Sequence, residues 1–388
     1  MINRVLRESV TFLESRLYAR LRDSARNLAL LSAGDVGRRL DDLQMQLDSV
    51  QSVLVELRED IGRAREEGAA CGARLDAVAI RLDDVVRRTH GLSTELRGDF
   101  YQRPEHPSST EYWTRHNVTA HRRFVSIEDS LDQLECRNRA YPGYIEMLPV
   151  SGKNGLAVLD YGCGPGHDLV GFAHYSRPHR LVGVDVSTSS LAEARQRLDL
   201  HGAPVEFVQI DYGNYDLPFD AASFDYIHCS GVLMCIEDPL RLLREFRRLL
   251  KPGGEARLMV YNYDSIWAHL YVAFIVQIEN GLYADLPTSV AFTRTTDGED
   301  CPVNAVWRPQ EMLTLGEAAG FVPEFLGAAI SLWELYVLPR RYIACLHPAL
   351  PRESRSFLAG LRLDSQGIPW HGEHRAGVDG CFRLQLPR

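Results

Sequence analysis

Three glycines at alternate positions form the segment of this sequence best suited to holding a nucleotide. The run at 162–166 reads GCGPG, and Asp160 stands two residues before it. Glycine has no Cβ, so such a backbone lets a ligand approach closely. Asp185, farther along, is an acid of the kind that accepts hydrogen bonds from both ribose hydroxyls. The pattern predicts a nucleotide-type cofactor, and it departs from the G-x-G-x-x-G spacing of a dinucleotide-binding dehydrogenase, the nearest competing interpretation.

The elements that must position these residues are alternating strands and helices. Apolar, strand-like runs are separated by helices of ordinary length, which indicates an α/β fold with a doubly wound parallel sheet. A helix over about 239–250 ends at 251–254, where a proline and two glycines stop it. The five expected strands cover 156–160, 181–185, 205–211, 224–230 and 256–261.

The glycine run resembles motif I of class I S-adenosylmethionine-dependent methyltransferases, of the type 11/25 kind, which have a Rossmann-like doubly wound sheet. Further landmarks follow in the order of that family: Asp211 at the end of the third strand, Ser230 at the end of the fourth, and 250–255 before the fifth. The resemblance implies S-adenosylmethionine as the cofactor, with Asp211 at the adenine amino group and Tyr212 stacked on the ring. The cofactor contacts that we expect are Asp160, Gly162, Cys163, Gly164, Gly166, Asp185, Val186, Asp211, Tyr212 and Ser230.

The sequence leaves the catalytic residue open. Methyl transfer mainly needs positioning and removal of water, and a base is required only if the acceptor must lose a proton. Many relatives carry a histidine after the fourth strand, but Met234 and Cys235 occupy that place here. His228 lies within a strand, which favours a packed core histidine, and His167 opens a helix, where the dipole disfavours its charged form. The weak candidates for the catalytic residue are His167, Asp264 and His269, and the candidates for the acceptor pocket are Asp264, His269 and Asp297.

Segments outside the predicted sheet must roof the pocket. Residues 111–116 and 137–144 supply aromatic and guanidinium groups that suit a cofactor cover or an anionic or sugar substrate. We expect the methyltransferase domain at 137–346, with a lid insertion at about 262–308. The pattern of residues 309–346 predicts a closing helix and the last two strands. Residues 347–388 are expected to form an ordered, turn-rich extension that could pack on the lid.

The N-terminal third has a different pattern. Residues 1–34 predict an amphipathic helix whose excess arginines suit an anionic lipid surface or a partner helix. Residues 35–95 repeat apolar positions every 3.5 residues, which predicts a long α-helical coiled coil and assembly into a homo-oligomer. Folding back onto the enzyme is the alternative. Residues 96–136 are expected to be a linker and a segment that covers the cofactor.

Composition limits the partners. The 388 residues carry a formal net charge of -9, which argues against a chain-wide nucleic-acid surface. The eight cysteines form no C-x-x-C pair, so we expect reduced thiols, no structural metal and a cytoplasmic protein. No long uncharged apolar run occurs, so membrane contact, if present, is expected at the inner face and peripheral.

The leading hypothesis is an enzyme that transfers a methyl group to a small-molecule or glycan acceptor, in surface-polysaccharide or natural-product biosynthesis. One alternative is an inactive methyltransferase-like scaffold or interaction protein, against which the intact Asp160, Asp185 and Asp211 argue. Another is an enzyme that uses the same cofactor fold for decarboxylation or cyclisation.

Overall fold

A seven-stranded sheet organises the part of the chain that the computed structural model describes, residues 108–117, 123–298 and 300–387. The strand order is β3-β2-β1-β4-β5-β10-β6, and the order reverses between β1 and β4. In open sheets of this kind, ligands bind beyond the carboxyl ends of the strands at such a switch point. The strands are β1 (Ala157–Tyr161), β2 (Arg180–Asp185), β3 (Glu206–Gln209), β4 (Phe224–Ser230), β5 (Leu250–Tyr261), β6 (Val322–Ala329) and β10 (Asp379–Gln385).

Strands β1 to β5 run parallel, and β10 is antiparallel to both of its neighbours. All five residues of β1 are buried, as expected of a central strand covered on both faces. The register brings Asp160 beside His228 of β4, and Asp379 beside Tyr261 of β5 and Ala329 of β6. Side chains that pair in this way share one face of the sheet.

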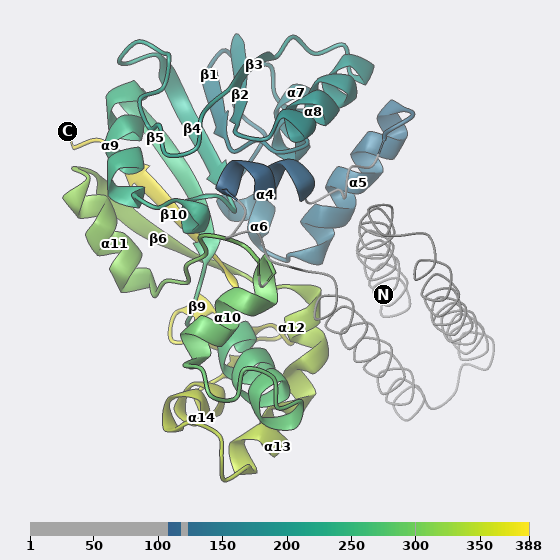
Figure 1. The fold of residues 1–388 in the computed structure, drawn as a ribbon, viewed down its shortest axis with the longest axis vertical. Coiled ribbons are helices and arrows are strands. Elements are labelled where there is room, and N and C mark those ends of the chain that lie inside the picture. Colours follow the sequence, from purple (N-terminus) through teal and green to yellow (C-terminus); the bar gives the residue numbers. More distant parts are fainter. Residues whose placement is uncertain (1–107, 118–122, 299, 388) are drawn as a thin grey trace, which may run out of the picture. The chain divides into compact units, whose positions relative to one another are not determined.

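Helices cover both faces of the sheet (Figure 1). One apolar cluster joins α5, α7 and α8 to β1, β2 and β4, and a second joins α9 and α11 to the opposite face. The short α6 lies against β10 and β6. The bounds are α4 (Ser109–Arg115), α5 (Ile127–Ala140), α6 (Tyr144–Met147), α7 (His167–Tyr175), α8 (Thr188–Leu200), the 3-10 turn η1 (Leu233–Cys235), α9 (Pro239–Leu249) and α11 (Pro309–Ala318).

A separate helical part has its own apolar core. Phe274, Val337, Phe357 and Leu358 are among its buried residues. Figure 1 shows α10, α12, α13 and α14 gathered together below the sheet. This part contains the π-helix η2 (Trp267–Glu279), α10 (Thr288–Thr296), α12 (Leu332–Val337), η3 (Leu338–Arg340), α13 (Arg341–Leu346), α14 (Arg352–Ala359) and a small sheet of β7 (Arg362–Leu363), β8 (Pro369–His371) and β9 (His374–Arg375).

The structure confirms the five predicted strands and the helix before the fifth, with two differences. Strand β3 ends at Gln209, short of the predicted 211. Strand β5 begins at Leu250, so the proline–glycine segment that we predicted as a turn lies within the strand, and its pairing with β4 shifts register there. Gly253 has a φ of 82°, the left-handed conformation expected of a turn residue.

The prediction for the end of the domain was wrong in one respect. Only one of the two strands expected in 309–346 forms there, namely β6, whereas 332–346 are helical. Ser331 and Glu334 form a reciprocal capping box that begins α12. The seventh strand is β10, so the sheet extends past residue 346 into the expected C-terminal extension. The rest of that extension is ordered, and α14 packs on η2.

The predicted amphipathic helix at 1–34, the coiled coil at 35–95 and most of the linker lie outside the described residues. In the part of the chain that the structure covers, the helices are all too short or too polar to cross a membrane. The seven cysteines of that part are free thiols, and its His, Cys, Asp and Glu side chains form no group of three or more suited to a metal ion.

Candidate functional site

The glycine loop joins the end of β1 to the start of α7, and its backbone is left-handed at all three glycines. Gly162 has a φ of 72°, and a Cβ built on it would lie 2.3 Å from Cγ2 of Val232. Gly164 has a φ of 52°, but a Cβ there would meet nothing within 4 Å. The first glycine is therefore required by packing within the protein, whereas the second faces open space.

Asp185, the last residue of β2, holds this loop in place. Its Oδ2 accepts a hydrogen bond of 2.8 Å from the backbone N–H of Gly164, and its Oδ1 accepts one of 2.8 Å from that of Ser187. Burial raises the pKa of Asp185, while these backbone donors favour its ionised form. Cys163 is buried against β2, and Val186 is half-buried. The predicted contacts on β1, its loop and β2 are thus brought together.

A buried charged cluster lies behind the loop. Asp160 is 3% exposed, and among the described residues its Oδ2 has no hydrogen-bond partner. Burial raises the pKa of Asp160 to about 7, with His228 lowering it and Asp168 adding to the rise. Asp168, on the first turn of α7, accepts two hydrogen bonds from the Arg137 guanidinium, at 2.5 and 3.2 Å. His228 Nε2 lies 3.2 Å from Asp168 Oδ2.

Tyr144 connects this cluster to the end of β4. Its hydroxyl lies 2.6 Å from the hydroxyl of Ser230, so the two form a hydrogen bond. The Arg137 guanidinium lies 4.5 Å from the centre of the Tyr144 ring. The segment at 137–144, predicted to roof the pocket, therefore does contact the carboxyl ends of the central strands.

The predicted adenine contacts follow β3. Asp211 is exposed, and Tyr212 is half-buried with its hydroxyl donating a hydrogen bond of 2.9 Å to the carbonyl of Cys235. Burial raises the pKa of Tyr212 to about 12, so the phenol stays protonated at neutral pH. The two side chains therefore follow the carboxyl end of β3 without being part of the core.

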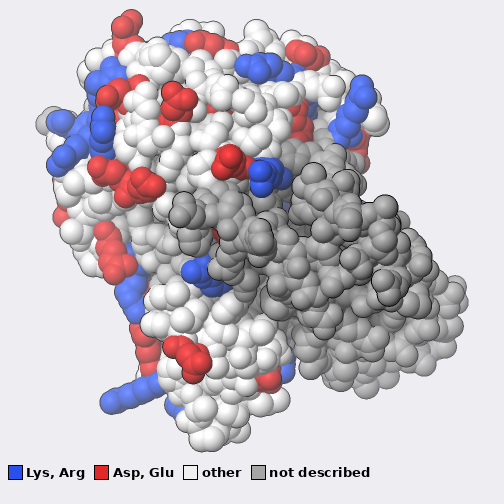
Figure 2. Space-filling view, viewed as in Figure 1, with Lys and Arg blue, Asp and Glu red and all other residues white. Residues whose placement is uncertain are grey.

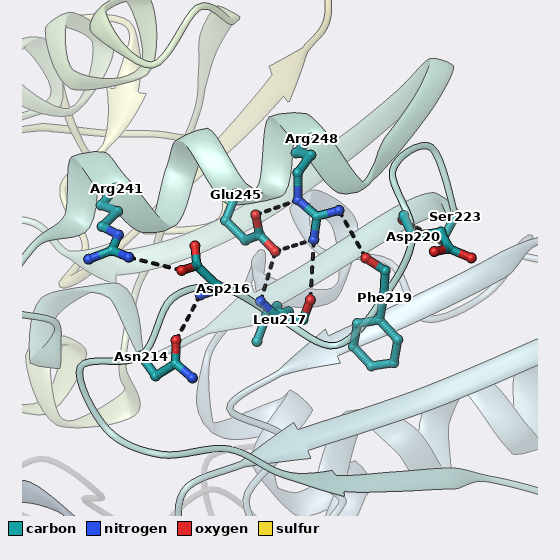
Figure 3. Close-up of polar contacts among 9 residues, drawn as sticks. All are labelled: Asn214, Asp216, Leu217, Phe219, Asp220, Ser223, Arg241, Glu245 and Arg248. Atoms are coloured by element: carbon teal, nitrogen blue, oxygen red, sulfur yellow. Dashed lines mark hydrogen bonds and ion pairs between the residues drawn. The ribbon is translucent and has the colours of Figure 1, made fainter.

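The segment after Tyr212 is clamped to α9 (Figure 3). Glu245 accepts a hydrogen bond of 2.9 Å from the N–H of Leu217 and two from Arg248, at 2.5 and 2.7 Å. Arg248 in turn donates to the carbonyls of Leu217 and Phe219, at 3.2 and 2.9 Å. An exposed pair, Arg241 with Asp216, lies at the other end of the helix. Together these contacts hold residues 216–219 of the β3–β4 connection against α9.

The weak catalytic candidates are not brought together. His167 is buried at the start of α7, where burial holds its pKa well below the usual range. His269 is 1% exposed in the core of the helical part, where it lies 3.1 Å from the Ser354 hydroxyl and burial lowers its pKa to about 3. Asp264 pairs with Arg308 at 2.7 Å. The surroundings of these three residues identify none of them as a catalytic base.

Sequence reasoning missed Asp168. It named Arg137 within the roof segment but did not give the arginine a partner. The available signal was an acidic residue in the first turn of the helix that follows the glycine loop, where the helix dipole favours a carboxylate. Asp297, a further candidate, does lie near the sheet edge, because its Oδ1 accepts a hydrogen bond of 3.0 Å from Tyr261.

Comparisons with known proteins agree with this geometry. Residues 158–254 match the family described as "Methyltransferase domain". An uncharacterised 37.1 kDa protein of a Streptomyces fradiae transposon is 32% identical over 167 residues, 42% of this chain and 44% of that protein. The probable methyltransferase ltbC of Aspergillus luteorubrus is 34% identical over 122 residues, 29% of this chain and 41% of that protein.

The chain thus spans less than half the length of these two relatives. Among solved structures, YcgJ of Bacillus subtilis is similar with a TM-score of 0.39 and 17% identity, over 63% of this chain and 97% of that one. The family match runs from β1 through the glycine loop, past the acidic residues after β2 and β3, to the start of β5. Residues 158–254 are therefore similar to methyltransferase domains, and S-adenosylmethionine is the cofactor that this similarity supports.

Proposed function

We propose that the chain transfers a methyl group from S-adenosylmethionine to a small-molecule or glycan acceptor. The observation that carries this proposal is the left-handed glycine loop tied to Asp185 at the point where the strand order reverses. A loop of this kind presents backbone and one carboxylate to a nucleoside, at the edge where ligands of open α/β sheets bind. We propose that the reaction takes place at that edge of the sheet.

The residues present fit the cofactor. Gly164 has open space where a Cβ would stand, so a ligand can lie against the loop there. Each Asp185 oxygen accepts one backbone hydrogen bond and keeps a further lone pair for a ribose hydroxyl. Asp211 has an exposed carboxyl group for the adenine amino group, and the half-buried Tyr212 offers its ring for stacking. Cys163, Val186 and Ser230 complete the proposed contacts.

When bound, S-adenosylmethionine supplies an electrophilic methyl group on a sulfonium. The protein's task is then to hold the acceptor in line with that group and to remove water. The helical part contributes tyrosines and a tryptophan next to the sheet edge, in a cluster that includes Tyr261 and Tyr263 with Trp267. We propose that residues 262–308 act as a lid over the acceptor.

Surface charge supports a small or neutral acceptor over a polyanion. On the face shown in Figure 2, Lys and Arg side chains are interspersed with Asp and Glu side chains over the described residues. A nucleic-acid substrate would instead favour a continuous basic stripe.

Calorimetric titration of the full chain with S-adenosylmethionine and, separately, with NADH tests the cofactor side of this proposal. We expect micromolar binding of the former alone. The methylation step is tested by mass spectrometry of products from sugar and phenol acceptors. Preference for NADH would refute the proposal, and a product with unchanged methyl content would indicate decarboxylation or cyclisation instead.

For the N-terminal third, the sequence pattern supports a second proposal. We propose that residues 35–95 assemble copies of the chain as a coiled coil and that 1–34 contact an anionic membrane surface or a partner helix. A variant lacking residues 1–98 should still bind S-adenosylmethionine and have a smaller assembly size in light scattering. A truncated protein that keeps the original assembly size would refute this role for the repeat.

A further inference from the structure

Asp379 opens β10 at the edge of the sheet where the cofactor loop lies. It pairs with Tyr261 and Ala329, the last residues of β5 and β6. Because β10 runs antiparallel to its neighbours, its first residue lies beside their carboxyl ends. Strand β4 ends at Ser230, which pairs with Met259 of β5, so Asp379 lies at the same edge, two strands away from β4.

The side chain of Asp379 belongs to the face covered by α6. Cys381, two residues farther along β10, packs with Tyr144 and Leu148, and residues two apart in a strand share a face. Tyr144 is also the residue whose hydroxyl bonds to Ser230. Asp379 therefore faces the same side of the sheet as the Tyr144–Ser230 pair at the end of β4.

Asp379 is buried without a hydrogen-bond partner in the described part of the chain. It is 4% exposed, and no hydrogen bond there reaches its carboxyl group. Its neighbour Glu334 is a useful contrast, because that carboxyl group accepts hydrogen bonds from Trp267 N, Ser331 N and Oγ, and Val378 N, at 2.8 to 3.2 Å. The Glu334 carboxyl group is therefore satisfied within the protein, whereas no hydrogen bond from the described residues occupies that of Asp379.

Charged groups from three helical segments act on Asp379. Burial raises its pKa well above the ordinary value, Glu334 of α12 and Asp297 at the end of α10 raise it further, and Arg137 of α5 lowers it. Within the sheet, its pairing partner Tyr261 directs its hydroxyl to Asp297. The carboxyl group thus has a raised affinity for a proton. The backbone before it is held in place, because the N–H of Asn262 donates a hydrogen bond of 2.7 Å to the carbonyl of Val378, the residue that precedes Asp379.

We propose that Asp379 is the general base that accepts the proton of an acceptor hydroxyl group. The inference rests on the proposed methyl transfer and adds the acceptor's functional group to it. As the acceptor oxygen bonds to the methyl carbon, the carbon–sulfur bond breaks, its electron pair stays on sulfur, and the hydroxyl proton passes to Asp379. The carboxyl group later releases that proton to water.

A hydroxyl acceptor fits this carboxyl group better than an amine does. A neutral alcohol keeps its proton at physiological pH, so transfer from it gains from a positioned base. An amine can lose its proton to solvent before binding. A base works best when its pKa lies near the working pH, and the surroundings of Asp379 move it in that direction.

The test compares Asp379→Asn with Glu334→Gln in the full chain. At about pH 8 we expect the Asp379 variant to melt roughly 2–4 °C higher than wild type, because a carboxyl group whose pKa is raised by folding costs stability above its ordinary pKa and an amide does not. Glu334→Gln should melt lower, because it disturbs a satisfied carboxylate. Binding of S-adenosylmethionine should stay within about twofold in Asp379→Asn, since the residue is proposed to touch only the acceptor.

Transfer is followed with tritiated cofactor and three probes: methyl α-D-glucopyranoside, catechol and benzylamine. We expect transfer to a hydroxyl probe, a loss of about 10²–10⁴-fold in Asp379→Asn, and loss of the rise in rate with pH. A lower melting temperature, an unchanged transfer rate, or transfer to benzylamine alone would overturn the inference. Failure of the wild-type chain to bind S-adenosylmethionine would instead refute the proposed function.

Discussion

Replacing Gly162 and Gly164 separately by alanine should separate an effect on stability from an effect on cofactor affinity. In Gly162→Ala the new residue takes a left-handed conformation, at a cost of about 1–2 kcal/mol. Its Cβ also meets Val232 at 2.3 and 2.9 Å, and overpacking of this kind costs about 1–3 kcal/mol. The free energy of unfolding should therefore fall by roughly 2–5 kcal/mol.

Gly164→Ala is the matched variant. It carries the same left-handed strain of about 1–2 kcal/mol, but its Cβ meets no protein atom within 4 Å. If the cofactor lies against this residue, the methyl group occupies the ligand's space, and affinity should fall at least about tenfold, or 1.4 kcal/mol. Urea unfolding measures the first quantity and calorimetric titration measures the second.

A third variant isolates the steric part. Val232→Ala removes the two methyl groups that approach Gly162, so the double variant should recover about 1–3 kcal/mol relative to additivity and keep the backbone strain. Additive effects in this cycle would show that the contact is not the source of the cost. Unchanged cofactor affinity in Gly164→Ala would refute the assignment of the loop as the cofactor cradle.

Three further substitutions test other parts of the site. Asp185→Ala should weaken S-adenosylmethionine binding by about 1.5–3 kcal/mol in calorimetry, and it should lower the melting temperature, since two loop N–H groups lose their acceptor. Burial opposes ionisation of Asp168, yet Arg137 and His228 hold its pKa well below the usual value, so this carboxylate stabilises the fold above about pH 4 and its contribution is lost as pH falls. Arg137→Met should thus cost about 3–5 kcal/mol near neutral pH in urea unfolding, and less in acid. Glu245→Ala should cost about 1–3 kcal/mol, whereas Asp216→Ala, in an exposed pair, should cost under about 1 kcal/mol; equal effects would refute the clamp on α9.

The half of the sheet that carries the glycine loop could be predicted because its signals are local. The strands β1, β2 and β4 are continuous apolar runs that end at polar residues, so pattern alone locates them to within a residue. The loop at 162–166 and Asp185 follow these strands directly along the chain. Once the strands are located, parallel pairing brings their carboxyl ends to one edge without any knowledge of distant contacts.

The other half could not be predicted, since its signals depend on pairing between distant segments. Strand β10 pairs with β5, more than a hundred residues earlier, and nothing in 377–380 distinguishes a strand start from a turn. The helical part could not be predicted for the same reason, because η2 and α14 share one core although β6 and α11 lie between them in the sequence. Local patterns describe each of these elements and leave open which others they contact.

This difference explains why the sequence did not single out Asp379. Its chemistry comes from the insertion of β10 between β5 and β6, which brings a carboxyl group from the start of a strand to an edge made of strand ends. The acids at that edge differ in their surroundings: the loop binds Asp185, Arg137 pairs with Asp168, and Asp379 has no hydrogen-bond partner in the described residues. Of these three acids, Asp379 is the one whose carboxyl group accepts no hydrogen bond from the described residues, so it is the one of the three best suited to accept a proton.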